Sequence, residues 1–155
     1  MENEYTYTSP VGEITVFCNE KAVTAVRFGK AAGENACETD LIKQVGAWLT
    51  DYFSGKATPV SFPVEAAGTD FQKRVWSALL EIPYGETRSY SQIAERIGCN
   101  AAVRAVGQAC NKNPVAIIVP CHRVVGKSGK LVGYEYGTEI KQYLLEPERR
   151  CVANE

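Results

Sequence analysis

The sequence predicts an α+β fold, in which a small antiparallel sheet with one helix precedes a mainly helical second half. Three observations predict this class. Short alternating apolar segments separated by turn residues fill roughly residues 5–28, which is typical of an antiparallel sheet. Apolar residues recur at helical spacing over 38–54. After a proline-containing stretch at 58–68, several short segments with helix-capping residues follow.

The first half is expected to hold three strands, over residues 5–8, 13–18 and 22–28, joined by tight turns. Leucine, isoleucine, valine and aromatic residues then form the apolar face of a helix over 38–54. The following stretch, 58–68, is the best linker candidate. We therefore expect two domains, spanning residues 1–68 and 69–155.

The second half contains two short helices joined by a glycine-containing turn. Ser89 and Gln92 predict a capping box for a helix over 90–97. Asn100 is expected to cap the next helix, over 101–110. This pattern is typical of a helix-turn-helix, which places its second helix in a DNA groove. The alternative is simple packing between helices, because small residues dominate the second helix.

Two further helices flank this motif. One begins at Thr69 or Asp70, either of which can cap a helix. The other runs from a Thr138 cap to Leu145. Pro147 is expected to end it, because proline removes a helical hydrogen bond.

Length and composition are those of an ordinary globular protein. The 155 residues are 45% apolar and 23% charged, and they contain no run of about 18 apolar residues that would predict a membrane helix. The acidic start lacks the apolar core of a secretory signal, so we expect a cytoplasmic protein. The six cysteines show no Cys-x-x-Cys spacing, and there is one histidine. We expect free thiols, no metal and no cofactor.

Charge is divided unevenly along the chain. Residues 1–70 carry five Lys and Arg against ten Asp and Glu, whereas residues 71–150 carry twelve against seven. No acidic residue occurs between Arg96 and Tyr134. This asymmetry predicts that a polyanion such as DNA meets the second half. A solvated basic face without a partner is the alternative.

The single histidine, His122, directly follows Cys121. Residues 115–119 are apolar and mostly β-branched, which predicts a buried strand that Pro120 stops. A thiol is a strong nucleophile as the thiolate, and histidine or cationic neighbours lower its pKa. Arg123 adds a permanent positive charge. The sequence therefore predicts a reactive cysteine rather than a metal pair, because neighbours in an extended segment point apart.

A reactive thiolate beside a DNA-reading helix could attack DNA. A soft thiolate suits an alkyl carbon, and displacement at an alkyl group on a base oxygen would leave a thioether on Cys121. A thioether resists hydrolysis, so the protein would act once. Reaching the base requires its extraction from the stack, at a cost of about a few kcal/mol. Arg104 could then fill the gap, and Tyr90 could press on a phosphate.

These residues resemble the O6-alkylguanine-DNA alkyltransferases, also called methylated-DNA–protein-cysteine methyltransferases. The resemblance rests first on Asn113-Pro114 and on Pro120-Cys121-His122-Arg123-Val124, and it is stronger over 69–150 than over 1–68. It implies a ribonuclease H-like N-terminal domain and a winged helix-turn-helix. It also implies irreversible repair of O6-alkylguanine, with O4-alkylthymine as a further candidate substrate, in duplex DNA. Other matching segments are Ser9–Gly12, Ser89–Tyr90, Ala101–Gly107, Gly133–Tyr134 and Lys141–Glu148.

The resemblance assigns catalytic roles by position. Cys121 would accept the alkyl group, His122 would deprotonate it through a water, and Glu148 would orient His122. Asn113 would brace the active-site turn. Tyr90 would rotate a phosphate and later donate a proton to the leaving base. The family default implies a monomer.

The resemblance also assigns contacts with DNA and substrate. Arg104 would replace the flipped base, which this family approaches through the minor groove. Val119 and Tyr134 would contact the guanine edge. Glu135 and Tyr136 stand where some members have small residues, which predicts a lower tolerance of large alkyl groups. Some members hold zinc in the N-terminal domain, and its ligands are missing here. The remaining expected DNA contacts are Tyr90, Ser89, Ala102, Ala105, Gly107 and Arg123.

Three alternatives remain open. A non-catalytic alkyl-lesion-binding protein would lack the acceptor cysteine, whereas Cys121 is present. A cysteine hydrolase would need Cys121 and His122 to bond directly, which neighbours on an extended chain rarely do. A DNA-binding regulator of this family would need a further domain, for which 155 residues leave no room.

Overall fold

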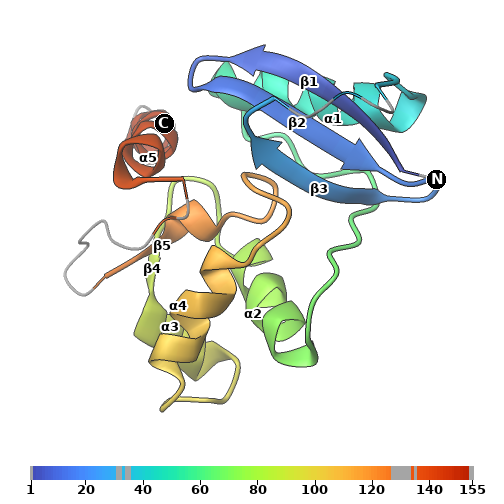
Figure 1. The fold of residues 1–155 in the computed structure, drawn as a ribbon. Helices are drawn as coiled ribbons and strands as arrows, with labels where there is room; N and C mark the ends of the chain where they lie inside the picture. Colours follow the sequence, from blue (N-terminus) through green and yellow to red (C-terminus); the bar gives the residue numbers. More distant parts are fainter. Residues whose placement is uncertain (1, 31–32, 34–35, 127–133, 135, 154–155) are drawn as a thin grey trace. The chain divides into compact units, whose positions relative to one another are not determined.

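The computed structural model describes all residues except 1, 31–32, 34–35, 127–133, 135 and 154–155 (Figure 1). For residues 138 and 149–153 it describes the backbone alone. Within the part described, no helix has both the length and the apolar character needed to span a bilayer. The chain forms two compact units, an N-terminal unit of Met1–Ala67 with Pro114–Ile118 and a C-terminal unit of Gly68–Asn113 with Val119–Glu155.

The N-terminal unit is built on a three-stranded antiparallel sheet. Strand β1 (Asn3–Ser9) pairs with β2 (Gly12–Cys18), which pairs with β3 (Val23–Phe28). Val16 lies opposite Val26 in this register, and both side chains are fully buried. Because side chains alternate between the faces of a strand, this register buries one apolar face of the sheet. The three predicted strands are confirmed.

Helix α1 (Asp40–Phe53) packs on this sheet and confirms the helix predicted over 38–54 (Figure 1). Its first turn is capped by the Thr39 hydroxyl, which accepts a hydrogen bond from the Ile42 amide at 3.2 Å. The buried residues recur three and four positions apart, so a single stripe of the helix faces the strands. They are Ile42, Val45, Gly46, Leu49 and Tyr52.

The apolar run 115–119 is buried, but the strand predicted there is wrong. The Val26 amide donates to the Pro114 carbonyl at 2.9 Å, and the Ala116 amide donates back to Val26 at 3.0 Å. These bonds make a single bridge to β3. The chain then turns at Ile117, whose φ is +69°. A left-handed φ ends a ladder, and sequence periodicity cannot reveal it.

Helix α2 (Asp70–Leu80) opens the C-terminal unit. Thr69 and Gln72 form a capping box at its start, so the predicted cap at Thr69 is confirmed. The Trp76 Nε1–H donates to the Ala109 carbonyl at 2.9 Å. This bond fixes α2 against the helix that contains Ala109. The buried residues of α2 are Val75, Trp76, Ala78 and Leu79, whereas Leu80 is exposed.

The predicted helix-turn-helix consists of α3 (Tyr90–Arg96) and α4 (Val103–Asn111). The capping box of Ser89 and Gln92 is confirmed. Asn100, however, does not cap α4. Ala102 occupies the cap position without a side-chain bond, and its amide is already bonded to a carbonyl of the preceding turn. The turn between the helices is therefore longer than predicted.

Two very short strands join α3 to the chain near Cys121. Strand β4 (Arg88–Ser89) pairs in parallel with β5 (Val124–Val125), directly after the 3-10 turn η1 (Cys121–Arg123). A strand of two residues is too short to show alternation, so sequence periodicity cannot predict β4 and β5. This small sheet ties the start of α3 to η1. The predicted α+β class is confirmed.

Helix α5 (Thr138–Ala153) is longer than predicted, because it continues through Pro147. An interior proline costs about 3 kcal/mol or more, since it lacks an amide and crowds the preceding turn. Glu148, the next residue, is buried and hydrogen bonded to two side chains of η1. These tertiary bonds outweigh the local preference of proline.

We expect Ser89→Ala to lower the free energy of unfolding by about 1 kcal/mol, because α3 loses the cap of the Gln92 amide. Urea denaturation measures the change. Ser91→Ala, in the exposed first turn of the same helix, is the matched control and should change stability by less than about 0.5 kcal/mol. Equal losses in both variants would show that the capping box contributes nothing.

Candidate active site

Cys121 begins η1 and lies in the interior of its unit, with 6% of its surface exposed. The Nδ2 of Asn113 donates to the Cys121 Sγ at 3.3 Å and to the Val119 carbonyl at 2.9 Å. Asn113 is itself buried. It therefore holds the chain on both sides of Pro120, directly where η1 begins, which fits the predicted bracing role. The extended setting predicted for Cys121 and His122 is wrong, because both lie on a 3-10 turn.

His122 and Glu148 form a buried pair between η1 and α5. The His122 Nε2 lies 2.7 Å from the Glu148 Oε2, and their side chains are 0% and 1% exposed. The Nε of Arg123 donates to the other carboxylate oxygen, Oε1, also at 2.7 Å. One carboxylate of α5 thus binds two consecutive residues of η1.

Burial and charge set the protonation of this pair. Burial lowers the pKa of His122 below its usual value, although the hydrogen bond and charge of Glu148 act in the opposite direction. Burial alone would raise the pKa of Glu148. The hydrogen bond of His122, the charge that His122 carries once it is protonated at acid pH, and Arg123 outweigh this effect and lower the pKa of Glu148 to about 2. Near neutral pH, the pair is a neutral imidazole beside an ionised carboxylate.

This arrangement fixes the tautomer of His122. An ionised carboxylate only accepts hydrogen bonds, so Glu148 takes its bond from Nε2–H. The proton-accepting nitrogen of the neutral ring is then Nδ1. His122 can therefore act as a base through Nδ1.

Lys141 is fully buried, and sequence reasoning missed it as a site residue. Its Nζ lies 5.9 Å from the centroid of the Tyr90 ring and 6.0 Å from that of Tyr134. Burial lowers the pKa of Lys141, while two nearby cysteines act in the opposite direction. The available signal was a lysine and a glutamate on an apolar helical stripe. That stripe is Lys141, Leu144, Leu145 and Glu148, each at most 1% exposed.

Tyr90, the first residue of α3, keeps its phenolic proton at neutral pH. Burial raises its pKa to about 12, with further contributions from Cys110 and Cys121. Burial likewise raises the pKa of Cys110 to about 12. A protonated phenol that interacts electrostatically with Cys121 can donate a proton. This fits the role predicted for Tyr90.

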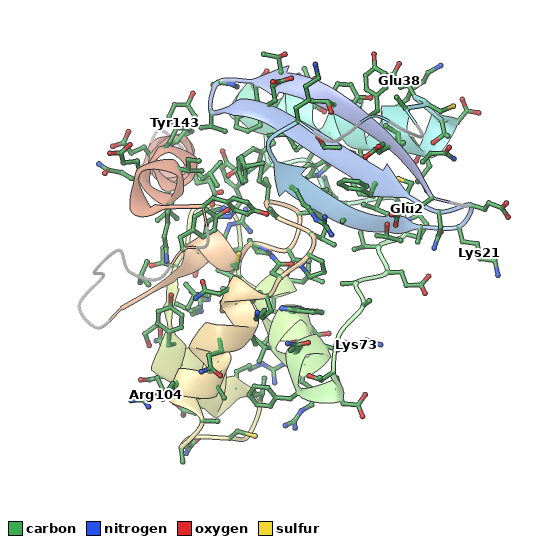
Figure 2. All side chains as sticks on the ribbon, in the orientation of Figure 1. Glu2, Lys21, Glu38, Lys73, Arg104 and Tyr143 are labelled. Carbon is green, nitrogen blue, oxygen red and sulfur yellow. The ribbon has the colours of Figure 1, made fainter. Side chains whose placement is uncertain are left out.

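The predicted DNA contacts on α4 fall into two groups. Arg104 is exposed (Figure 2). Ala102 and Ala105 are partly exposed. Gly107 instead faces α3, because a Cβ placed on it would lie 3.9 Å from the ring of Tyr90. Gly107 therefore contributes to packing between helices, which was the alternative interpretation of the small residues in this helix. Val103, which the prediction did not include, is 37% exposed beside Arg104.

Arg123, a predicted DNA contact, has a mostly buried side chain that is bonded within its own unit. Its side chain is 12% exposed, and its Nη1 donates to the Ile82 carbonyl at 2.9 Å. Its guanidinium carbon also lies 5.6 Å from the centroid of the Tyr84 ring. Together with the bond to Glu148, these contacts hold the guanidinium inside the unit. Arg123 therefore belongs with His122 and Glu148.

The expected substrate pocket is described in part. Tyr134 is buried, and its ring lies 5.8 Å from that of the partly exposed Tyr136 in an edge-on arrangement. Glu135 lies outside the described residues. Ser89 is partly buried at the start of α3. Among the residues described, no group of three or more His, Cys, Asp or Glu could hold a metal ion.

We expect the free energy of unfolding to fall as the pH drops from about 7 to 2. His122 has a lowered folded pKa, so its contribution is present above 6.5 and is lost on acidification. Glu148 contributes fully above 4.5, and about 3 kcal/mol is lost as the pH falls to about 2. Urea denaturation at several pH values measures the free energy of unfolding. The control is Glu148→Gln, whose free energy of unfolding should depend less on pH. A gain of stability between pH 6.5 and 3 would contradict it.

Family models match both halves of the chain. A model described as the ribonuclease-like domain of 6-O-methylguanine DNA methyltransferase matches residues 4–66. A second, described as the DNA binding domain of the same protein, matches residues 70–150. The second match contains all the residues of the site.

Individual relatives agree with these models. A Methanosarcina barkeri protein named methylated-DNA–protein-cysteine methyltransferase is 47% identical over 146 residues, covering 90% of this chain and 92% of its own length. A Mycobacterium tuberculosis protein of the same name is also 47% identical, over 93% of this chain and 90% of its own. The crystal structure of Mycobacterium tuberculosis OGT in complex with DNA has a TM-score of 0.89 at 44% identity, covering 96% and 94% of the two chains. This chain therefore belongs to the methylated-DNA–protein-cysteine methyltransferase family.

Proposed function

We propose that this chain repairs DNA by transferring the methyl group of O6-methylguanine to Cys121, once per molecule. The observation that carries the proposal is the buried arrangement around the sulfur. Asn113 donates a hydrogen bond to Sγ, and Glu148 holds the adjacent His122 in the tautomer that accepts a proton at Nδ1. The names of the relatives support transfer from methylated DNA to a cysteine.

The reaction is a displacement at the methyl carbon. The Cys121 sulfur forms a bond to that carbon, while its bond to guanine O6 breaks and leaves the electron pair on guanine. The thiol proton passes through a water to His122 Nδ1. Tyr90, which burial keeps protonated, supplies the proton that guanine gains. One proton passes from the thiol to His122 and one passes from Tyr90 to guanine, so the protons balance.

The product explains why each molecule would act once. Methyl transfer converts Cys121 into a thioether, which resists demethylation because the Cys121 thiolate would have to leave as a poor leaving group. Asn113 presents an amide to the sulfur, and Tyr90 is a protonated phenol, so neither is a nucleophile suited to remove the methyl group. The protein would therefore be consumed in stoichiometric amounts.

We further propose that a monomer binds double-stranded DNA containing O6-alkylguanine and flips the lesion out from the minor groove side. The exposed Arg104 on α4 would fill the vacated space in the duplex. Val119, Tyr134, Glu135 and Tyr136 would line the alkyl pocket. Methyl should therefore be preferred to bulkier alkyl groups, with O4-methylthymine as a second substrate.

Product stoichiometry tests this function. Protein mixed with an excess of duplex containing O6-methylguanine should restore guanine to one equivalent per protein and then stop, as measured by nucleoside chromatography. Cys121→Ser should restore none while still binding the duplex. Sustained turnover would contradict single use. Binding by the unmodified protein with no methyl loss would favour the non-catalytic lesion-binding alternative.

A further inference from the structure

Glu148 uses its two carboxylate oxygens for two different partners. Oε2 bonds to the Nε2 of His122 and Oε1 to the Nε of Arg123, both at 2.7 Å. The guanidinium is itself fixed from another side, because its Nη1 donates to the Ile82 carbonyl at 2.9 Å. Its guanidinium carbon lies 5.6 Å from the Tyr84 ring centroid. The carboxylate is thus clamped from two directions.

The proposed role of His122 as a base requires that Glu148 stays ionised, and these contacts of Arg123 meet that requirement. A buried carboxylate bonded to a neutral imidazole alone would tend to take up a proton, because burial disfavours its charge. A protonated carboxyl group could donate to His122, and the imidazole would then lose the tautomer with a basic Nδ1. A permanent cation on the second oxygen keeps the carboxylate ionised and stops its rotation.

We propose that Arg123 is a positioning residue for methyl transfer, which holds Glu148 so that His122 stays neutral and accepts the thiol proton at Nδ1. This inference rests on the proposed role of His122 and extends it to a residue whose predicted role was contact with DNA. Arg123 acts through Glu148 rather than on the substrate. Because its side chain is mostly buried, Arg123 is poorly placed to contact a DNA phosphate.

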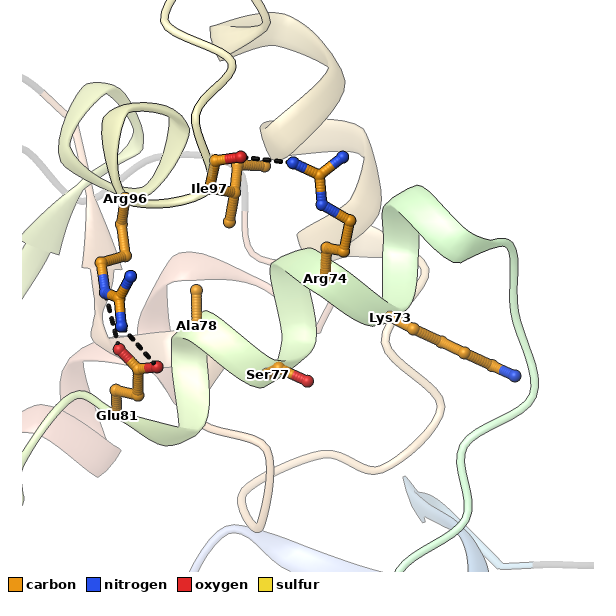
Figure 3. A pocket seen from close by; sticks show the side chains of 7 residues that line it. All are labelled: Lys73, Arg74, Ser77, Ala78, Glu81, Arg96 and Ile97. Carbon is orange, nitrogen blue, oxygen red and sulfur yellow. Dashed lines mark hydrogen bonds and ion pairs between the residues drawn. The ribbon is translucent and has the colours of Figure 1, made fainter.

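The same chemical pair occurs on the surface of the unit and provides a matched control. Arg96 binds Glu81 through Nε at 2.8 Å and Nη2 at 3.1 Å, beside a surface pocket between α2 and α3 (Figure 3). Both side chains are more than half exposed. Exposed ion pairs of this kind contribute little to the free energy of unfolding. Removing Arg96 therefore deletes an arginine–carboxylate pair without touching the site.

The experiment measures the single-turnover rate of methyl transfer from saturating O6-methylguanine duplex between pH 5 and 9. Among the residues that the structure describes, the charged groups that act on His122 are Glu148 and Lys141 on α5 and Arg123 on η1. In Arg123→Met, a positive charge that opposes protonation of His122 is lost. The acid limb of the profile should therefore move to higher pH by about one unit. The rate should fall about tenfold at pH values below the limb and by no more than about threefold near pH 7, and it should recover toward pH 9.

Two further variants separate positioning from a merely structural role. Arg123→Lys keeps the charge but cannot reach both Glu148 and the Ile82 carbonyl in a fork, so its limb should shift in the same direction by less. Arg96→Met should have the wild-type profile. A folded Arg123→Met with an unshifted limb would overturn the assignment. If Arg123→Met fails to fold, an Arg123→Lys protein with the wild-type rate and limb would overturn it instead.

His122→Gln distinguishes this inference from the function on which it rests. Loss of the acid limb in His122→Gln, with an unshifted limb in Arg123→Met, would refute the role of Arg123 alone. A limb that persists in His122→Gln would refute the proposed proton transfer to His122, and the role of Arg123 with it. A limb lost in His122→Gln and shifted in Arg123→Met supports both.

Discussion

Glu148→Ala is expected to lower the free energy of unfolding by about 3–5 kcal/mol, because it removes the buried partner of a charged residue. Arg123 would keep its buried charge without the carboxylate, and His122 would lose its bond at Nε2. Helix α5 would also lose the contacts that outweigh its interior Pro147. The transfer rate of the folded fraction should fall about 100-fold or more, since the base is no longer oriented.

Urea denaturation and single-turnover kinetics measure the two effects. Glu81→Ala is the matched control, because it removes a carboxylate that is 53% exposed from its partner Arg96. That change should cost less than about 1 kcal/mol and leave the transfer rate unchanged. A Glu148→Ala protein as stable as Glu81→Ala would show that the buried network does not hold α5 to η1.

Arg104→Ala is expected to slow repair of duplex DNA about 100-fold while leaving the reaction with the free O6-methylguanine base within about twofold. Extraction of a base from the stack costs about a few kcal/mol, and a residue in the gap offsets part of it. The free base needs no extraction. The measurement is the transfer rate on both substrates at saturating concentrations.

Lys112→Ala provides the matched control for charge. Lys112 is an exposed cation at the C-terminal end of α4, so its removal deletes the same charge from the same helix. It should weaken binding at high salt and leave the saturated rate on duplex DNA unchanged. Equal loss on duplex and free base in Arg104→Ala would contradict the gap-filling role.

Local features of the fold were predictable from the sequence because local interactions determine them. Turn residues and alternation located β1, β2 and β3, and the stripe around Val45 and Leu49 located α1. The caps at Thr69 and Ser89 depend on residues three positions apart, so they were visible as well.

Errors occurred where distant contacts override local preference. The run 115–119 has the composition of a strand, yet it makes a single bridge to β3, at Val115, and Ile117 turns away. Pro147 should end a helix, yet the bonds of Glu148 hold α5 beyond it. No periodicity within either segment carries this information.

The site was predictable to a similar extent. Cys121 and His122 stand out in sequence as neighbours, and the family resemblance pointed to Asn113 and Glu148, which the structure places at hydrogen-bonding distance from them. The sequence predicts a DNA contact at Arg123, because it shows the charge of this residue but not the carboxylate that binds it. Lys141 was missed because its charge alone predicts exposure, and only its place on the apolar stripe of α5 indicates burial.

The most direct test of the account is the location of the methyl group after reaction. Protein mixed with duplex containing O6-methylguanine is digested, and each cysteine peptide is analysed by tandem mass spectrometry. The account predicts one methyl group on Cys121 and none on the other five cysteines, with no transfer to Cys121→Ala. Methyl on another cysteine, or guanine restored by Cys121→Ala, would contradict it.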